Sequence, residues 1–267
     1  MTSGSIRAGI GGWIFEPWRG TFYPEGLSKT KELEYAGQHL QTIEINSTYY
    51  GTQKPATFAK WASQVPDGFV FSVKGNRFVT NRRVLAEAGE SIERFIKSGI
   101  AELSDRLGPL IWQFAPTKKF DADDFGAFLD LLPKKESGLP LRHAVEVRNP
   151  SFIDPDFIAL ARQKDVAVVY AEHFEYPEIA DVTADFVYAR LQKGDDTVET
   201  AYPAEALDKW ADRVKLWAKG DVPDDLPLAS PKQHPEKHPR DVFVYFIHEG
   251  KVRAPQAAQA LTQRLNA

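Results

Sequence analysis

The chain has 267 residues, of which 43% are hydrophobic and 26% charged, with a formal net charge of −4 and no cysteine. Such a composition is ordinary for a globular protein with a sizeable core. The lack of cysteine excludes disulfides, thiolate catalysis and cysteine-ligated metal sites, and the negative charge argues against attraction of the whole surface to nucleic acid. No signal-like start and no run of 18 apolar residues is present, so we expect a cytoplasmic protein with no membrane partner.

Eight short apolar or β-branched runs predict eight strands, and most are separated by segments with helical periodicity. In chain order the predicted strands are Ile6–Gly11, Thr42–Asn46, Phe69–Lys74, Leu110–Phe114, His143–Arg148, Val166–Tyr170, Asp185–Arg190 and Val242–His248. Asp121 and Asp154 stand where helix N-caps are expected. Eight alternations favour an α/β fold, a single (β/α)8 TIM barrel with eight parallel strands, over an open doubly wound sheet. We expect residues 1–267 to form this one domain.

Two segments depart from the regular alternation. Residues 171–184 are too few and too irregular for a full helix, so we expect a loop or a single turn in the sixth unit. Between residues 220 and 240 a proline recurs every four residues, which forbids a helix and predicts an extended, mobile surface loop before the last strand. His234 and His238 stand four apart in this loop, but Pro235 removes helical geometry, so we favour a solvated loop over a metal site.

Side-chain alternation along the predicted strands sends polar residues toward the barrel axis. The inward set is Glu44, Asn46, Ser72, Lys74, Ile111, Gln113, Glu146, Arg148, Tyr188 and Arg190. Its polar members lie at the carboxyl ends of their strands, which is where barrel enzymes assemble active sites. The sequence therefore predicts that five strands bring charged and amide groups to one rim.

Three residues of this set are candidate catalytic groups. Glu44 and Glu146 suit general acid and base roles, and Lys74 suits polarisation of an anionic group. The alternative is an internal network of Glu44, Lys74, Glu146 and Arg148 that fills the barrel and binds nothing. Because burying charges costs several kcal/mol, we favour a ligand site.

Two loops add a basic and an aromatic wall to the predicted rim. The segment 74–83 (KGNRFVTNRR) has four positive residues and no acid, which suggests a phosphate or carboxylate on the ligand, with a solvated loop as the alternative. The segment 9–24 (GIGGWIFEPWRGTFYP) holds five aromatic residues, about half of which we expect to pack the loop while Trp13 or Trp18 borders the ligand. The candidate substrate-binding residues are Asn46, Gln113, Arg148, Arg190, Arg77, Trp13, Trp18 and Tyr49.

Several motifs together resemble the YecE-like family, a widespread group of TIM-barrel proteins catalogued as a domain of unknown function. The motifs are 11–13 (GGW), 18–20 (WRG), 43–50 (IEINSTYY), 71–74 (FSVK), 113–116 (QFAP), 146–151 (EVRNPS) and 188–191 (YARL). The resemblance spans nearly the whole chain and implies a single TIM barrel, with no established activity. Relatives commonly have histidine where this chain has Asn81 and Gln192, and Phe-Asn-Asn where it has Phe246-Ile247-His248. A mechanism that relies on those imidazoles would not operate here, which leaves a different ligand or a loss of activity.

We expect an enzyme, a hydrolase or a lyase, that acts on a small anionic substrate, either phosphorylated or carbohydrate-like. The alternative is a non-catalytic protein that binds nucleic acid or a nucleotide-bearing ligand through Arg77, Arg82, Arg83 and the aromatic first loop. A third hypothesis is that the barrel is an inert scaffold. Neither a Walker pattern, nor G-x-G-x-x-G, nor H-E-x-x-H is present, so the sequence points to no particular cofactor or metal, and it says nothing of the oligomeric state.

Overall fold

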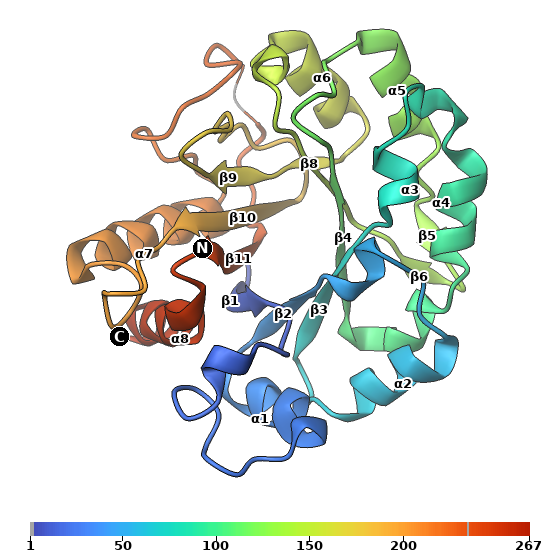
Figure 1. The fold of residues 1–267 in the computed structure, drawn as a ribbon. Helices are drawn as coiled ribbons and strands as arrows, with labels where there is room; N and C mark the ends of the chain where they lie inside the picture. Colours follow the sequence, from blue (N-terminus) through green and yellow to red (C-terminus); the bar gives the residue numbers. More distant parts are fainter. Residues whose placement is uncertain (1–2, 234) are drawn as a thin grey trace.

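The computed structural model describes residues 3–233 and 235–267 and shows a parallel barrel surrounded by helices (Figure 1). Its sheet has the order β8-β7-β4-β3-β2-β1-β11-β10-β9. The strands are β1 (Ile6–Gly11), β2 (Thr42–Ile45), β3 (Val70–Lys74), β4 (Leu107–Gln113), β7 (His143–Glu146), β8 (Ala167–Val168), β9 (Tyr170–Glu172), β10 (Phe186–Lys193) and β11 (Asp241–Glu249). A short antiparallel hairpin, β5 (Lys135–Glu136) and β6 (Leu139–Pro140), lies outside this sheet.

Strands β8 and β9 are two parts of one barrel strand, separated only by Val169. The first part pairs with β7 and the second with β10, and the Val169 amide still donates to the Val145 carbonyl at 2.9 Å. The nine strands of the sheet therefore close into eight barrel positions. The predicted α/β TIM barrel is confirmed.

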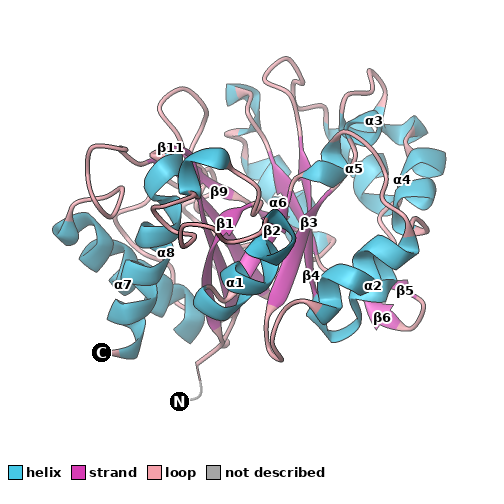
Figure 2. Cartoon of the chain, turned by 60° about the horizontal axis from the view of Figure 1, so that its bottom comes forward, coloured by secondary structure: helices cyan, strands magenta, loops and turns pink. Residues whose placement is uncertain are grey.

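The helices lie around the outside of the strands, as Figure 2 shows. They are α1 (Glu32–His39), α2 (Pro55–Ser63), α3 (Arg77–Thr80), α4 (Gly89–Ile96), α5 (Ala122–Asp130), α6 (Pro155–Gln163), α7 (Ala204–Lys219) and α8 (Ala254–Asn266). Short 3₁₀ turns are η1 (Glu16–Trp18), η2 (Lys29–Lys31), η3 (Ser47–Tyr49), η4 (Leu85–Glu87), η5 (Ile100–Arg106), η6 (Pro150–Phe152) and η7 (Lys251–Arg253).

The expected N-caps are confirmed, because the Asp121 and Asp154 side chains accept from the backbone amides of α5 and α6. Among the described residues no helix combines the length and apolar character needed to cross a membrane.

The core has two layers, one between strands and helices and one inside the barrel. The inner layer is apolar and aromatic, and includes Ile111 and Tyr188 of the predicted inward set. Gly9 belongs to the inward face of β1. A Cβ there would lie 1.9 Å from the Thr42 carbonyl oxygen, so only glycine lets β1 and β2 approach this closely.

The sixth unit has no helix in residues 171–184, as predicted, but the first two of these residues belong to β9 rather than to a loop. The Pro-rich segment packs against this unit. The Asp181 carboxylate accepts hydrogen bonds from the amides of Ala229 and Ser230 at 2.6 and 3.1 Å. All three residues are buried, together with Leu226. The Pro-rich segment therefore covers a unit that lacks its own helix.

The prediction for residues 220–240 needs a correction. The described part of this segment contains no helix, as its prolines require, but it is not wholly a surface loop, because Leu226 and Ala229 join the core. The sequence pattern missed this docking because the contact depends on Asp181, far away in the chain. His234, one half of the histidine pair, lies outside the described residues.

Candidate functional site

Both predicted carboxylates lie on the barrel axis and are fully buried. Arg190, on β10, donates from Nη2 to Glu44 Oε1 at 3.0 Å and from Nη1 to Glu146 Oε2. The Tyr188 hydroxyl donates to the other Glu44 oxygen at 2.7 Å. The strand alternation that sent Glu44, Glu146 and Arg190 inward is therefore confirmed. One guanidinium thus bridges two carboxylates from different strands, β2 and β7.

Glu146 receives two further hydrogen bonds on Oε1, from Gln113 Nε2 at 2.8 Å and from Arg148 Nε at 2.7 Å. Burial by itself raises the pKa of Glu146, but the charges of Arg190, Arg148 and Lys74 outweigh that effect and lower the pKa to about 2. Such a carboxylate stays ionised at neutral pH, far from the range in which a general acid or base works well. This argues against the predicted proton-transfer role of Glu146 and for a role in holding the arginines.

Lys74 lies at the end of β3 and is 8% exposed. Its Nζ lies 4.6 Å from the centre of the Tyr49 ring. In the part of the chain that the structure describes, this amine makes neither an ion pair nor a hydrogen bond, because Arg190 already holds both nearby carboxylates. Burial, followed by the charge of Arg190, lowers the pKa of Lys74 to about 8. A minor fraction of the amine is therefore neutral near physiological pH, far more than for an exposed lysine.

A cleft of about 820 Å³ opens at the carboxyl ends of the strands, directly at this network. Seven predicted residues line it, namely Trp13, Trp18, Asn46, Lys74, Gln113, Arg148 and Arg190. Tyr49 is absent from the lining and contacts the Lys74 amine instead. No group of three or more His, Asp or Glu side chains within residues 3–233 and 235–267 is arranged to hold a metal ion.

The aromatic first loop divides as expected between packing and the cleft wall. Trp18 is 1% exposed and donates from Nε1 to the Lys251 carbonyl at 2.8 Å, while Phe22 and Tyr23 are buried beside it. Trp13 is only half-buried and meets Trp61 edge to face, with ring centres 5.1 Å apart. Both rings line the cleft, but Trp13 is the more exposed of the two, and Trp18 anchors the loop.

Gln192 and His248 are among the lining residues that the predicted site did not include. Gln192 is 1% exposed, and among the described residues its Nε2 and the neighbouring Arg190 Nε have no hydrogen-bond partner. Buried donors without acceptors cost about 1–3 kcal/mol each. His248 has a φ of +70°, a conformation that is uncommon outside glycine. Gln192 lies two residues after Arg190 in β10, so strand alternation could have predicted that its side chain points inward as well.

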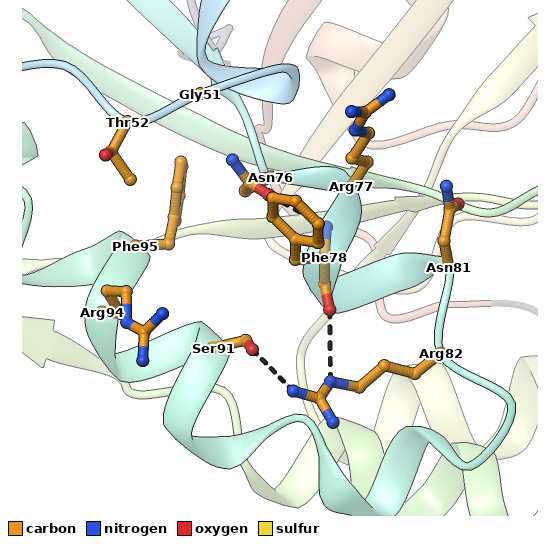
Figure 3. A pocket seen from close by; sticks show the side chains of 10 residues that line it. All are labelled: Gly51, Thr52, Asn76, Arg77, Phe78, Asn81, Arg82, Ser91, Arg94 and Phe95. Carbon is orange, nitrogen blue, oxygen red and sulfur yellow. Dashed lines mark hydrogen bonds between the residues drawn. The ribbon is translucent and has the colours of Figure 1, made fainter.

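Arg77 lies apart from this cleft, which corrects its predicted placement. It lines a second pocket of about 700 Å³ between α3 and α4, together with Phe78, Arg82 and Arg94. Figure 3 shows Arg82 held between Phe78 and Ser91, with hydrogen bonds of 3.2 Å to the Phe78 carbonyl and 2.8 Å to Ser91 Oγ.

The cause of this separation is the start of α3 immediately after β3. The Asn76 side chain accepts from the Phe78 amide and begins the helix, which carries the basic loop away from the axis. Tyr50 stands between the two sites, because it lines the central cleft while the Arg77 guanidinium lies 5.8 Å from its ring centre. The chain thus presents two neighbouring cationic sites rather than one.

The closed parallel barrel and the charged cleft at the carboxyl ends of its strands define a TIM-barrel protein with a rim site. Within that class, the chain belongs to the family described as "Protein of unknown function DUF72", whose model matches residues 7–267. The broad form of the resemblance, a TIM-barrel family of unknown function, is therefore confirmed.

Three relatives illustrate this membership. The UPF0759 protein YunF of Bacillus subtilis is 24% identical over 157 residues, which are 57% of this chain and 54% of that protein, so the alignment spans about half of its length. A DUF72 family protein of Enterococcus faecalis is similar in structure with a TM-score of 0.72 and 18% identity, over 98% of this chain and 96% of that one. A DUF72 family protein of Thermotoga maritima gives a TM-score of 0.70 and 21% identity over 97% of each chain. At these identities the solved structures show the shared fold.

Proposed function

We propose that this protein is an enzyme that acts on a small anionic substrate in the rim cleft, with Lys74 as its reactive group. The observation that carries the proposal is that the Lys74 amine lines the cleft without a carboxylate partner, while Glu44 and Glu146 are both bound by Arg190. A buried lysine that is left unpaired is costly, and such costs concentrate at functional sites.

Anionic substrates suit the donors that surround this amine. Arg148 and Arg190 line the cleft, and both are oriented by Glu146. The buried Gln192 amide adds a donor on the same wall. A phosphate or carboxylate accepts several such hydrogen bonds at once, which gives orientation as well as affinity.

Of the two reaction classes expected from the sequence, a lyase fits this geometry better than a hydrolase. Hydrolysis by paired carboxylates needs one of them to be protonated, whereas Glu44 and Glu146 both accept hydrogen bonds from the Arg190 guanidinium, which favours their ionised forms. Lys74, whose pKa is about 8, is the group placed to exchange a proton near neutral pH. In this proposal Glu44 and Glu146 position the cations and do not act on the substrate.

Thermal-shift titration tests the proposal. We expect phosphorylated sugars or small organic acids to stabilise the wild type, since a ligand at a hundred times its dissociation constant adds about 2.7 kcal/mol. The shift should be lost in Lys74→Met and kept in Lys60→Met, which changes an exposed lysine on α2. A shift that persists unchanged in Lys74→Met would contradict a ligand at this site.

A second candidate function has an observation of its own. The pocket between α3 and α4 combines Arg77, Arg82 and Arg94 with the exposed ring of Phe78. Cations beside an exposed aromatic ring are typical of surfaces on which the bases of single-stranded nucleic acid stack. This supports binding of nucleic acid or a nucleotide at the second pocket as the alternative.

A further inference from the structure

We infer that Lys74 forms an imine with its substrate, and that the substrate is a small aldehyde or ketone that carries a phosphate or carboxylate. This inference rests on the proposed function, because it uses the same cleft and the same anion-binding arginines. It adds the functional group on which the enzyme acts and the covalent bond through which it does so.

The first argument is the availability of the amine. Lys74 Nζ is at the cleft, and the carboxylates closest to the axis are occupied: Glu44 by Arg190 and Tyr188, Glu146 by Arg190, Arg148 and Gln113. An amine that serves as a structural cation is normally paired when it is buried this deeply. Within the described residues Lys74 has only the face of the Tyr49 ring beside it. The nitrogen is therefore left open toward the cleft.

The second argument is activation of the nitrogen as a nucleophile. Lysine amines become nucleophilic when they are desolvated or when they lie next to another cation, and both conditions apply to Lys74. The side chain is 8% exposed, and Arg190 is the strongest cationic neighbour. Their combined effect agrees with the pKa of about 8, which leaves roughly a tenth of the amine neutral at pH 7.

Charged and aromatic groups on several elements around Lys74 contribute to this balance. Glu44 on β2 and Glu146 on β7 favour the charged amine, whereas Arg148 after β7 and Arg190 on β10 disfavour it. The Tyr49 ring on η3 also attracts the cation. Burial and the arginines together prevail over the two glutamates, because each glutamate is already neutralised by hydrogen-bonded guanidinium groups.

The chemical step is balanced without any further reagent. The neutral Nζ attacks the carbonyl carbon and forms a C–N bond while the C=O π pair moves to oxygen. The two amine protons leave with that oxygen as water, and a C=N bond remains. Protonation of the imine gives a cation that withdraws electrons from the adjacent carbon, which is what a lyase needs to break a bond there. Arg148 and Gln192 would hold the anionic group meanwhile.

Reductive trapping on the full chain tests the inference. Wild-type protein at pH 8 is treated with sodium cyanoborohydride and glyoxylate, pyruvate or dihydroxyacetone phosphate, with uncharged dihydroxyacetone as the comparison. We expect peptide mass mapping to find one dominant reduced adduct, on Lys74, formed at least tenfold faster than on exposed Lys60, and faster with the anionic carbonyls. Labelling of Lys74 no faster than Lys60 with all four compounds overturns the inference.

Two further measurements separate this inference from the proposed function. Lys74→Arg retains the charge without a nucleophilic amine, so it should bind anions and lose the dominant adduct. Thermal shifts with non-carbonyl anions, such as glycerol phosphate, report the anion site alone. If these anions bind but Lys74 is not trapped, the imine fails and the anion-binding cleft stands. If no anion binds and Lys74 is not trapped, both the imine and the proposed anion-binding function are wrong.

Discussion

Lys74 and Arg190 line the same cleft, but Arg190 holds both buried carboxylates and Lys74 holds neither. The division has a physical basis, because a guanidinium offers a planar fork of donors that can serve two acceptors and an ammonium does not. The carboxylates are thereby neutralised by Arg190. The nearby ammonium keeps most of its desolvation cost and gains little attraction in return.

We first predict that Lys74→Met stabilises the protein at pH 7. Folding lowers the pKa of Lys74 from 10.5 to about 8, so the charged amine costs the native state up to about 3 kcal/mol, and methionine removes that cost. Urea unfolding measures the gain, with exposed Lys60→Met expected to change the free energy of unfolding by less than about 0.5 kcal/mol. A less stable Lys74→Met protein would favour the structural network instead.

The same residue predicts a pH dependence with a defined sign. Between pH 8 and 10.5 the unfolded chain keeps the Lys74 proton that the native state has lost, so wild-type stability rises with pH in this window. The advantage of Lys74→Met should therefore shrink from pH 8 toward pH 10.5. Denaturant midpoints of both proteins across this range test it, and a gap that stays constant contradicts a lowered pKa.

Strand alternation was enough to predict the axial residues from the sequence. The inward direction of Glu44, Lys74 and Arg190 follows from the period of two in a strand, which depends only on local pattern, and from the barrel class. Strand alternation was not enough to predict which cation pairs with which carboxylate. Glu44 and Arg190 are 146 positions apart, and which cation takes which carboxylate follows from strand register around the closed barrel.

Local structure that begins two residues beyond a strand was harder to predict. Asn76 caps α3 directly after β3 and turns Arg77 toward the second pocket, a change that the charge pattern of the loop did not reveal. The docking of residues 226–230 also escaped prediction. The spacing of the prolines shows only that the segment cannot form a helix. Its burial depends on hydrogen bonds to the Asp181 carboxylate, which is distant in the sequence.

We next predict that Glu146→Gln destabilises the protein and changes its response to acid. Removing this charge leaves Arg190 and Arg148 partly unpaired, at a cost of about 3–5 kcal/mol at neutral pH. In the wild type the pKa of Glu146 falls from 4.5 to about 2 on folding, so its stabilisation is complete above pH 4.5 and is lost as the pH drops toward 2. The variant should lack that portion of the acid transition.

Acid unfolding monitored by fluorescence distinguishes this effect from that of His143. Burial lowers the pKa of His143 to about 4, so its contribution is lost as the pH falls from 6.5 to 4, in both proteins. A matched control is Glu90→Gln, which changes an exposed carboxylate on α4 that pairs with Arg94. Glu146→Gln and Glu90→Gln curves of the same shape would contradict the assignment.

The docked Pro-rich segment gives a fourth prediction. Asp181→Ala leaves the buried amides of Ala229 and Ser230 without an acceptor, so we expect a loss of about 1–3 kcal/mol in the free energy of unfolding. Proteolysis between residues 220 and 240 should also become faster. The control Asp224→Ala changes an exposed aspartate of the same segment and should behave like wild type. Equal cleavage rates in the two variants would show that Asp181 does not fasten the segment.

The last prediction separates the two candidate functions. If single-stranded nucleic acid binds at the second pocket, Arg77→Gln with Arg82→Gln removes two phosphate partners and lowers the slope of log affinity against log salt by about 1.4. Phe78→Ala removes a stacking surface and should cost about 1–3 kcal/mol of binding energy. Fluorescence anisotropy with a labelled oligonucleotide measures both.

Lys74→Met should leave this binding intact, because Tyr50 stands between the two sites. Affinity that depends on Lys74 and is unchanged by loss of Arg77 and Arg82 would instead place any polyanion in the central cleft, as a mimic of its small anionic substrate.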